Sequence, residues 1–301
     1  MRVVTIGSGV AGVGRSFAAA NLAVALAHRG ARTCLVDLDF QNAEQHLLLG
    51  QLRPQRSVLE LLRGEALSMA ELMISADLGG RLFLVPGAPE TIRPASLRGS
   101  DVDRLVSELR QLPAEFVVVD LPASTAHQAL DLFLAGDAQY LVSTTDPAAL
   151  AAGGAYLRLA RSRRATRRGA GTPLRSPRVY NTLDDLVRDM DAIRSDAGEA
   201  GPRFRPGLIL NRCPLDDEAS AAALRALRAA AGEGIEPPLE AEIPEDLAVD
   251  RATMLLDPVV EYAPTSPASA AIGALAAALL PRTAVDAFGP LPSDLFEAVP
   301  A

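Results

Sequence analysis

The stretch TIGSGVAGVGRSF, Thr5–Phe17, contains two overlapping glycine motifs. One begins at Gly7 and reads G-x-G-x-x-G, the pattern of dinucleotide-binding loops. The other begins at Gly9 and reads G-x-x-x-x-G-R-S, a phosphate-loop pattern in which Arg15 stands where lysine is usual. The surrounding sequence has to decide between these two loops.

Apolar runs alternate with helical patterns along most of the chain, which predicts an α/β fold with a doubly wound, mostly parallel sheet flanked by helices. The expected strands are Arg2–Ser8, Thr33–Asp39, Leu82–Pro86, Phe116–Leu121, Gln139–Thr144, Gly207–Asn211 and Glu240–Ile243. The expected helices are Ser16–Arg29, Asp101–Gln111, Thr125–Ala135, Pro147–Arg164, Asp217–Ala231, Asp246–Leu255 and Ser266–Leu280. We expect a single domain over residues 1–280, interrupted by an insertion at about 161–206 that contains a helix near Leu183–Ile193. Residues 281–301 are expected to form a flexible tail.

Composition narrows the class of protein. The 301 residues are 49% hydrophobic and include no apolar run long enough to span a membrane. The first residues lack the pattern of a secretory leader, and the two cysteines resemble small core residues, so we expect a cytoplasmic location. All 29 basic residues are arginine, so no lysine elsewhere in the chain can replace one missing from the loop.

A dinucleotide loop is disfavoured by spacing. The acid that binds the ribose normally lies about 20 residues after the glycines, whereas Asp37 follows Gly12 by 25 residues. Nothing later in the chain supplies a redox centre. An NAD(P)- or FAD-binding Rossmann oxidoreductase therefore remains a secondary alternative.

A phosphate loop explains more of the sequence. Gly9, Gly12 and Gly14 allow backbone N–H groups to turn toward phosphate oxygens at a helix N-terminus. Ser16 then lies where a hydroxyl group binds Mg²⁺, and the strand in FVVVDLPA ends in a second acid, Asp120.

The ordered motifs resemble the MinD/ParA family of deviant phosphate-loop ATPases, which position cell machinery. The resemblance rests on VAGVGRS in the loop, VDLDFQNAEQHLLLG after the second strand, VVVDLPA, LILNR and the segment that begins IPEDLAVDRA. It covers the chain as far as Leu280. The H-x-x-L-G stretch from His46 to Gly50 favours the MinD/FlhG-like branch.

The resemblance implies specific roles. Asp39 orients the attacking water, and Asn211 and Arg212 contact adenine. Ser16, Asp37 and Asp120 hold Mg²⁺ directly or through water. The implied nucleotide-binding residues are Gly9, Val10, Ala11, Gly12, Val13, Gly14, Arg15, Ser16, Phe17, Asn211 and Arg212.

Both lysines of the family loop are missing. Val10 replaces the lysine that reaches across a dimer, and Arg15 replaces the lysine that holds the β- and γ-phosphates. Arginine retains the charge in a larger planar fork, whereas valine retains nothing. We therefore expect weak Mg-ATP binding and impaired or absent hydrolysis in a nucleotide-binding switch. The alternative is a nucleotide-independent scaffold for protein partners, and whether the chain is an enzyme stays open.

Partners follow from the same resemblance and from charge. A homodimer is expected, nucleotide-dependent if ATP binds, together with protein partners of a positioning or motility system. Arg161–Arg178 lies in a basic stretch without acids, which suggests polyanion contact or a solvated loop. The last residues, Ser293–Ala301, carry two acids and no base, so we expect no membrane-anchor helix.

Overall fold

Within the described part of the chain, eight strands form one sheet in the order β3-β4-β2-β5-β1-β6-β7-β8. A computed structural model describes residues 1–76, 79–87, 97–168, 182, 204–214 and 217–280. The strands are β1 Arg2–Gly7, β2 Thr33–Asp37, β3 Ile74–Ser75, β4 Leu82–Val85, β5 Phe116–Asp120, β6 Ala138–Ser143, β7 Gly207–Cys213 and β8 Leu239–Pro244. All neighbours pair in parallel except β3 and β4. The expected doubly wound, mostly parallel sheet is confirmed.

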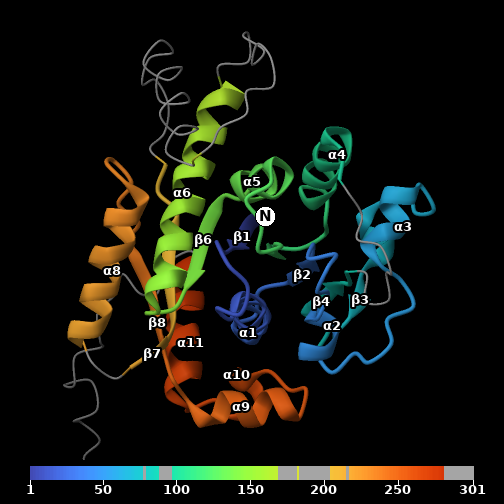
Figure 1. Cartoon of the computed structure of the whole chain (residues 1–301). Coiled ribbons are helices and arrows are strands. Elements are labelled where there is room, and N and C mark those ends of the chain that lie inside the picture. Colours follow the sequence, from blue (N-terminus) through green and yellow to red (C-terminus); the bar gives the residue numbers. More distant parts are fainter. Residues whose placement is uncertain (77–78, 88–96, 169–181, 183–203, 215–216, 281–301) are drawn as a thin grey trace, which may run out of the picture.

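Helices cover both faces of this sheet (Figure 1). They are α1 Arg15–His28, α2 Gln45–Leu48, α3 Val58–Arg63, η1 Met69–Leu72, α4 Gly99–Leu109, α5 His127–Leu134, α6 Pro147–Arg168, α8 Asp217–Ala231, α9 Leu247–Met254, α10 Val259–Tyr262 and α11 Pro267–Leu279. Figure 1 shows α5 and α6 on one side of β1, and α1 and α11 on the other.

Successive strand residues enter opposite cores, because side chains alternate across a sheet. Val3 packs in a core with α4, α5, α6 and α8. Its neighbour Val4 packs in the second core with α1 and α11. The strands are buried on both faces, which explains why they form continuous apolar runs in the sequence.

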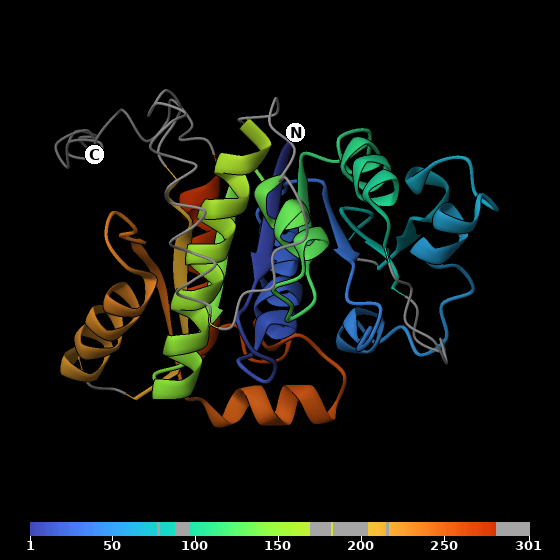
Figure 2. The same cartoon turned by 45° about the horizontal axis from the view of Figure 1, so that its top comes forward.

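The strand order brings distant chain segments to one edge. β5 lies between β1 and β2, so β1 ends beside Asp120 and β2 ends beside the same strand. In the usual dinucleotide-binding order β1 and β2 are direct neighbours, an order that this sheet does not have. Figure 2 shows α9 lying across this carboxyl edge.

The structure adds elements that the sequence analysis did not predict. These are the short antiparallel β3 and the small helices α2, α3, η1 and α10. Helix α6 continues to Arg168, four residues past Arg164, where we expected it to end. The insertion expected at about 161–206 stays a prediction. No glycine or proline lies between Gly154 and Arg168 to end the helix earlier. The expected helix near Leu183–Ile193 and the tail from residue 281 lie outside the described residues.

Candidate functional site

The loop between β1 and α1 leaves its backbone donors available. Gly12 and Gly14 have φ values of 81° and 86°, a left-handed conformation that favours glycine. In the described part of the chain, no backbone N–H of residues 9–14 donates a hydrogen bond. Helix α1 begins at Arg15 without a side-chain cap or an acid in its first turn. Such a helix start with free N–H groups attracts anions.

The guanidinium of Arg15 is directed toward two carboxylates. Its Nη2 donates to Asp39 Oδ2 at 2.6 Å and its Nε donates to Asp120 Oδ1 at 2.7 Å. Nη1 donates to Ser8 Oγ at 3.2 Å. The Arg15 side chain is only 8% exposed, and the two carboxylates are 3% and 1% exposed. Arg15 therefore joins β1, β2 and β5 through a buried charged network.

Electrostatics stabilise this network in its charged form. Burial alone would lower the pKa of Arg15, but the Asp120 and Asp39 carboxylates raise that pKa above its ordinary value. Burial raises the pKa of the Asp37 carboxyl well above its usual range, and the nearby Asp120 charge raises it further. Asp37 is therefore harder to ionise than a solvated carboxyl group, and Arg15 is the cation opposite Asp39 and Asp120.

Two residues of this network were not predicted from the sequence. Ser8 accepts from Arg15 and donates to the carbonyl of Val10 at 2.9 Å. Gln45 Nε2 donates to Asp120 Oδ2 at 2.7 Å and to the Ser16 carbonyl at 3.1 Å. Gln45 comes from the short helix α2, and no spacing rule in the sequence links it to the loop. Its Oε1 is buried and has no hydrogen-bond partner.

The late strand β7 brings Asn211 and Arg212, to which the resemblance assigns adenine contact, against the loop itself. Asn211 Nδ2 donates to the Val13 carbonyl at 2.9 Å, and Arg212 Nη1 donates to the Gly12 carbonyl at 3.4 Å. A Cβ at Gly14 would lie 2.0 Å from Asn211 Nδ2. Glycine is thus needed there for space as well as for conformation.

The remaining loop positions differ in exposure. Val10 is 40% exposed on the loop surface, and Ala11 is also exposed. Val13 is buried, and Phe17 packs half-buried against the core that contains α1. A Cβ at Gly9 would lie 2.2 Å from the carbonyl oxygen of Ala152, so α6 holds the loop closely. All eleven predicted nucleotide-binding residues therefore lie around one loop, with no nucleotide contact yet tested.

The predicted Mg²⁺ ligands come together, but their oxygens are already engaged. Asp37 Oδ1 and Oδ2 accept from the backbone N–H groups of Asp39 and Gln45. Asp39 Oδ1 accepts from the N–H groups of Gln41 and Asn42. With the contacts of Arg15 and Gln45, all six carboxylate oxygens of Asp37, Asp39 and Asp120 accept a hydrogen bond.

The positive charge of Arg15 also opposes a cation. Two unit charges 4 Å apart interact by about 4 kcal/mol at an effective dielectric constant of about 20, and a divalent ion doubles that repulsion. Mg²⁺ requires near-ideal octahedral geometry around oxygen ligands. Across the described ranges, no group of three His, Cys, Asp or Glu side chains could hold a metal ion. The residues present do not fit Mg²⁺ while Arg15 keeps these contacts.

Several arginines of the basic run contact the protein itself. Arg163 Nε and Nη2 donate to the two carboxylate oxygens of Asp131 at 2.8 and 2.7 Å, which joins α6 to α5. Arg161 donates to the Glu233 carbonyl, and Arg164 lies 5.9 Å from the Phe204 ring centroid. Residues 169–178 of the run lie outside the described residues. Polyanion contact stays an untested prediction.

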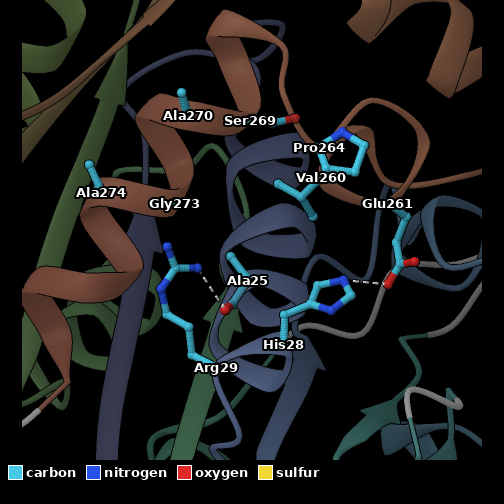
Figure 3. A pocket seen from close by; sticks show the side chains of 10 residues that line it. All are labelled: Ala25, His28, Arg29, Val260, Glu261, Pro264, Ser269, Ala270, Gly273 and Ala274. Carbon is cyan, nitrogen blue, oxygen red and sulfur yellow. Dashed lines mark hydrogen bonds and ion pairs between the residues drawn. The ribbon is translucent and has the colours of Figure 1, made fainter. Parts of the chain in front are cut away.

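A separate hollow of about 510 Å³ lies between α1, α10 and α11 (Figure 3). His28 Nε2 pairs with Glu261 Oε1 at 2.6 Å beside it. Arg29 Nη1 donates to the carbonyl of Ala25 in its own helix at 3.2 Å. Because each charged side chain labelled in this hollow has a protein contact, we assign no ligand to it. None of the helices described in the structure meets the length and hydropathy needed to cross a bilayer.

A family model and individual relatives indicate the same family of P-loop NTPases. The family described as "ParA: NUBPL iron-transfer P-loop NTPase" matches residues 1–161. The septum site-determining protein MinD of Escherichia coli K12 is 28% identical over 148 residues, which cover 48% of this chain and 53% of that protein. The chain thus spans about half the length of the curated relatives it matches.

Solved structures extend the similarity in fold over most of the chain. MinD of Pyrococcus horikoshii, whose structure is a complex with Mg-ADP, has a TM-score of 0.60 and 22% identity, covering 91% of this chain and 94% of that chain. A ParA family ATPase from Chlorobium tepidum has a TM-score of 0.66 and 19% identity, covering 92% and 97%. At these identities the likeness concerns the fold.

Proposed function

We propose that this chain, which belongs to the MinD/ParA-type family of P-loop NTPases, is an adenine-nucleotide-binding switch with impaired or absent hydrolysis. Its task is that of a positioning protein, which changes its partners with its nucleotide state. The observation that carries the proposal is the buried contact of Arg15 with Asp39 and Asp120. In this contact the Arg15 guanidinium occupies Asp39 and Asp120, two acids that the family resemblance assigns to hydrolysis, while the backbone of the phosphate-binding loop stays available for a nucleotide.

Support for nucleotide binding comes from the backbone. The free N–H groups of residues 9–14 and the uncapped start of α1 form an anion-binding environment that no side chain of the loop closes. Asn211 and Arg212 contact the same loop from β7, where the family resemblance expects adenine. A nucleotide would therefore find its phosphate site and its base site adjacent.

Support for impaired hydrolysis comes from Asp39. An acid that orients water must accept a hydrogen bond from that water. Here Asp39 Oδ2 accepts from Arg15 at 2.6 Å and Oδ1 accepts from two backbone N–H groups. Phosphoryl transfer also needs cations at the transferring group. Val10 supplies none, and the charge of Arg15 is directed toward the carboxylates.

The alternative function, a nucleotide-independent scaffold, is favoured by the same network. With Arg15 bound to Asp39, Asp120 and Ser8, and with Gln45 and backbone N–H groups on the other oxygens, the carboxylates of Asp37, Asp39 and Asp120 have hydrogen-bond donors without a ligand. A protein of this kind would keep the fold and its docking surfaces and have no affinity for ATP. Nucleotide binding is the property that separates the two functions.

We also propose a homodimer that associates through the loop face. Val10, 40% exposed, occupies the position of the lysine that the resemblance assigns to the dimer contact. An apolar side chain there adds contact area and no charge. Dimerisation would show in the molar mass from light scattering, measured with and without ATP.

Isothermal titration with ATP, ADP and NADH tests the proposed function. We expect weak binding of the adenine nucleotides and none of NADH. Absence of ATP binding at millimolar concentrations would leave the scaffold function, and tighter binding of NADH would restore the dinucleotide alternative. Phosphate release, followed in parallel, is expected not to exceed that of the Asp39→Ala variant.

A further inference from the structure

We infer that the guanidinium of Arg15 is the resident cation of the site and takes the place of Mg²⁺, so that the protein binds adenine nucleotide independently of divalent metal. The inference rests on the proposed nucleotide binding, and it deepens that function by naming the form of ligand the site accepts. The ligand is therefore a nucleotide polyphosphate that carries no metal ion.

The first argument is the direction of the Arg15 side chain. The resemblance places a lysine at this position in contact with the β- and γ-phosphates. The guanidinium here contacts instead one oxygen of Asp39 and one of Asp120, at 2.6 and 2.7 Å. Its planar fork presents separate N–H groups to the two carboxylates in a fixed geometry.

The second argument is the satisfaction of the acids. Asp120 accepts from Arg15 on one oxygen and from Gln45 on the other. The acids that would otherwise attract a hard cation thus have protein donors for every carboxylate oxygen. Metal binding would have to displace a guanidinium that is only 8% exposed.

The third argument concerns the phosphates. Among the described residues, the backbone N–H groups of residues 9–14 donate no hydrogen bond and remain available on the loop. These donors can bind phosphate oxygens without a metal ion. Separate groups would therefore neutralise the acids and bind the phosphates: Arg15 contacts the acids, and the loop backbone is left for the ligand.

The experiment has one arm with nucleotide. ATP affinity is measured by isothermal titration in excess EDTA and in excess Mg²⁺, for wild type, Arg15→Lys and Arg163→Lys. We expect wild type and Arg163→Lys to have the same affinity in both buffers, within about twofold, and Arg15→Lys to bind at least about tenfold more tightly with Mg²⁺. A tenfold or greater Mg²⁺ effect in wild type overturns the inference and leaves the proposed function intact.

The second arm needs no nucleotide, so it remains decisive if ATP does not bind. Thermal unfolding is followed with Mn²⁺ and with NaCl of equal ionic strength, for wild type, Arg15→Met and the matched control Arg163→Met. We expect Mn²⁺ to raise the midpoint of Arg15→Met alone, because that variant leaves Asp39 and Asp120 without their counter-ion. Should Arg15→Met not fold, Arg15→Lys takes its place, since a compact ammonium group lacks the planar fork that holds Asp39 and Asp120 together.

The outcomes of the two arms are distinct. A Mn²⁺ response in wild type, or none in either Arg15 variant, overturns the inference, because the guanidinium would then not occupy a cation site. Failure of ATP binding in both buffers overturns the proposed function and the metal-free nucleotide ligand with it, and the second arm then decides by itself whether Arg15 is the resident cation.

Discussion

Two arginine–aspartate contacts in this protein have similar hydrogen-bond distances and different arrangements of their acids. Arg163 binds both oxygens of Asp131 at 2.8 and 2.7 Å, from α6 to α5. Arg15 binds one oxygen each of Asp39 and Asp120 at the carboxyl edge of the sheet. The Arg163 side chain is 25% exposed, whereas that of Arg15 is 8% exposed. The first contact joins two helices, and the second fills a site.

The difference shows that the role of a buried arginine depends on how many acids it contacts and on which elements carry them. Arg163 contacts both oxygens of Asp131, which lies on the single helix α5. Asp39 and Asp120 come from segments 81 residues apart and meet because β2 and β5 are neighbouring parallel strands. Two acids at one place attract a cation, and Arg15 supplies it from within the chain.

The largest effect is expected on turnover. Restoring both lysines, Val10→Lys with Arg15→Lys, should give measurable ATP hydrolysis, because a cation supplied at the transferring phosphoryl group is worth roughly 10³–10⁵ in rate. Phosphate release is compared for wild type, Asp39→Ala and the double variant. Arg163→Lys serves as the control and should remain at the wild-type level. Wild-type turnover that Asp39→Ala abolishes would show that Arg15 is compatible with catalysis.

The next effect is on stability. Arg15→Met should lower the free energy of unfolding by about 3–5 kcal/mol, because it leaves two buried carboxylates without a cation. Arg163→Met should cost about 1–2 kcal/mol, since its contact is partly solvated and involves one acid. Urea unfolding at neutral pH measures both. Equal losses would contradict the distinction between the two contacts.

Alanine variants at two crowded glycines, Gly14 and Gly154, distinguish an effect on nucleotide binding from an effect on packing. A Cβ at Gly14 would meet Asn211, and a Cβ at Gly154 would meet the backbone of Ala230 in α8, 2.5 Å away. Both alanine variants should be destabilised, by about 1–3 kcal/mol from strain and overpacking.

Only the loop variant should also weaken ATP binding, because Gly14 lies where the phosphate-binding N–H groups turn. Gly12→Ala is the control for backbone strain, since nothing lies within 4 Å of its Cβ position. Titration of the three variants with ATP checks this order. A loss of affinity in Gly154→Ala equal to that in Gly14→Ala would remove the distinction.

The smallest effect concerns the thiols. Burial raises the pKa of Cys34 to about 12, and burial also raises the pKa of Cys213. The thiolate is the reactive form, so neither residue should react with a thiol reagent at pH 8 in the folded protein. Arg15→Met should react faster than Arg163→Met at Cys34, because Cys34 lies on β2, the strand that leads to Asp37 and Asp39. Fast labelling of the wild type would indicate that β2 opens readily.

Much of the site followed from the sequence. Asp37, Asp39 and Asp120 were predicted to lie together, and they do, because the carboxyl ends of parallel strands meet at one edge. Asn211 and Arg212 were expected to contact adenine; the structure places them against the Val13 and Gly12 carbonyls of the loop, and the adenine contact stays a prediction. Gln45 and Ser8 were missed, because a polar residue that bonds to a distant acid leaves no periodic signal. The length of α6 was underestimated, since its arginine-rich end was taken for part of an insertion.

The sequence by itself determined the doubly wound sheet, the glycine loop and the convergence of the acids, because alternation, turn residues and strand ends are local properties of the chain. Only the tertiary structure decided where the Arg15 side chain points. A long flexible side chain takes the direction in which its partners lie, and those partners, Asp39 and Asp120, come from strands 24 and 105 residues away. The two carboxylates come within hydrogen-bond distance of Arg15, and become buried, only after the sheet has formed. Arg15, which stands where a phosphate loop usually has lysine, then acts as the counter-ion of these acids.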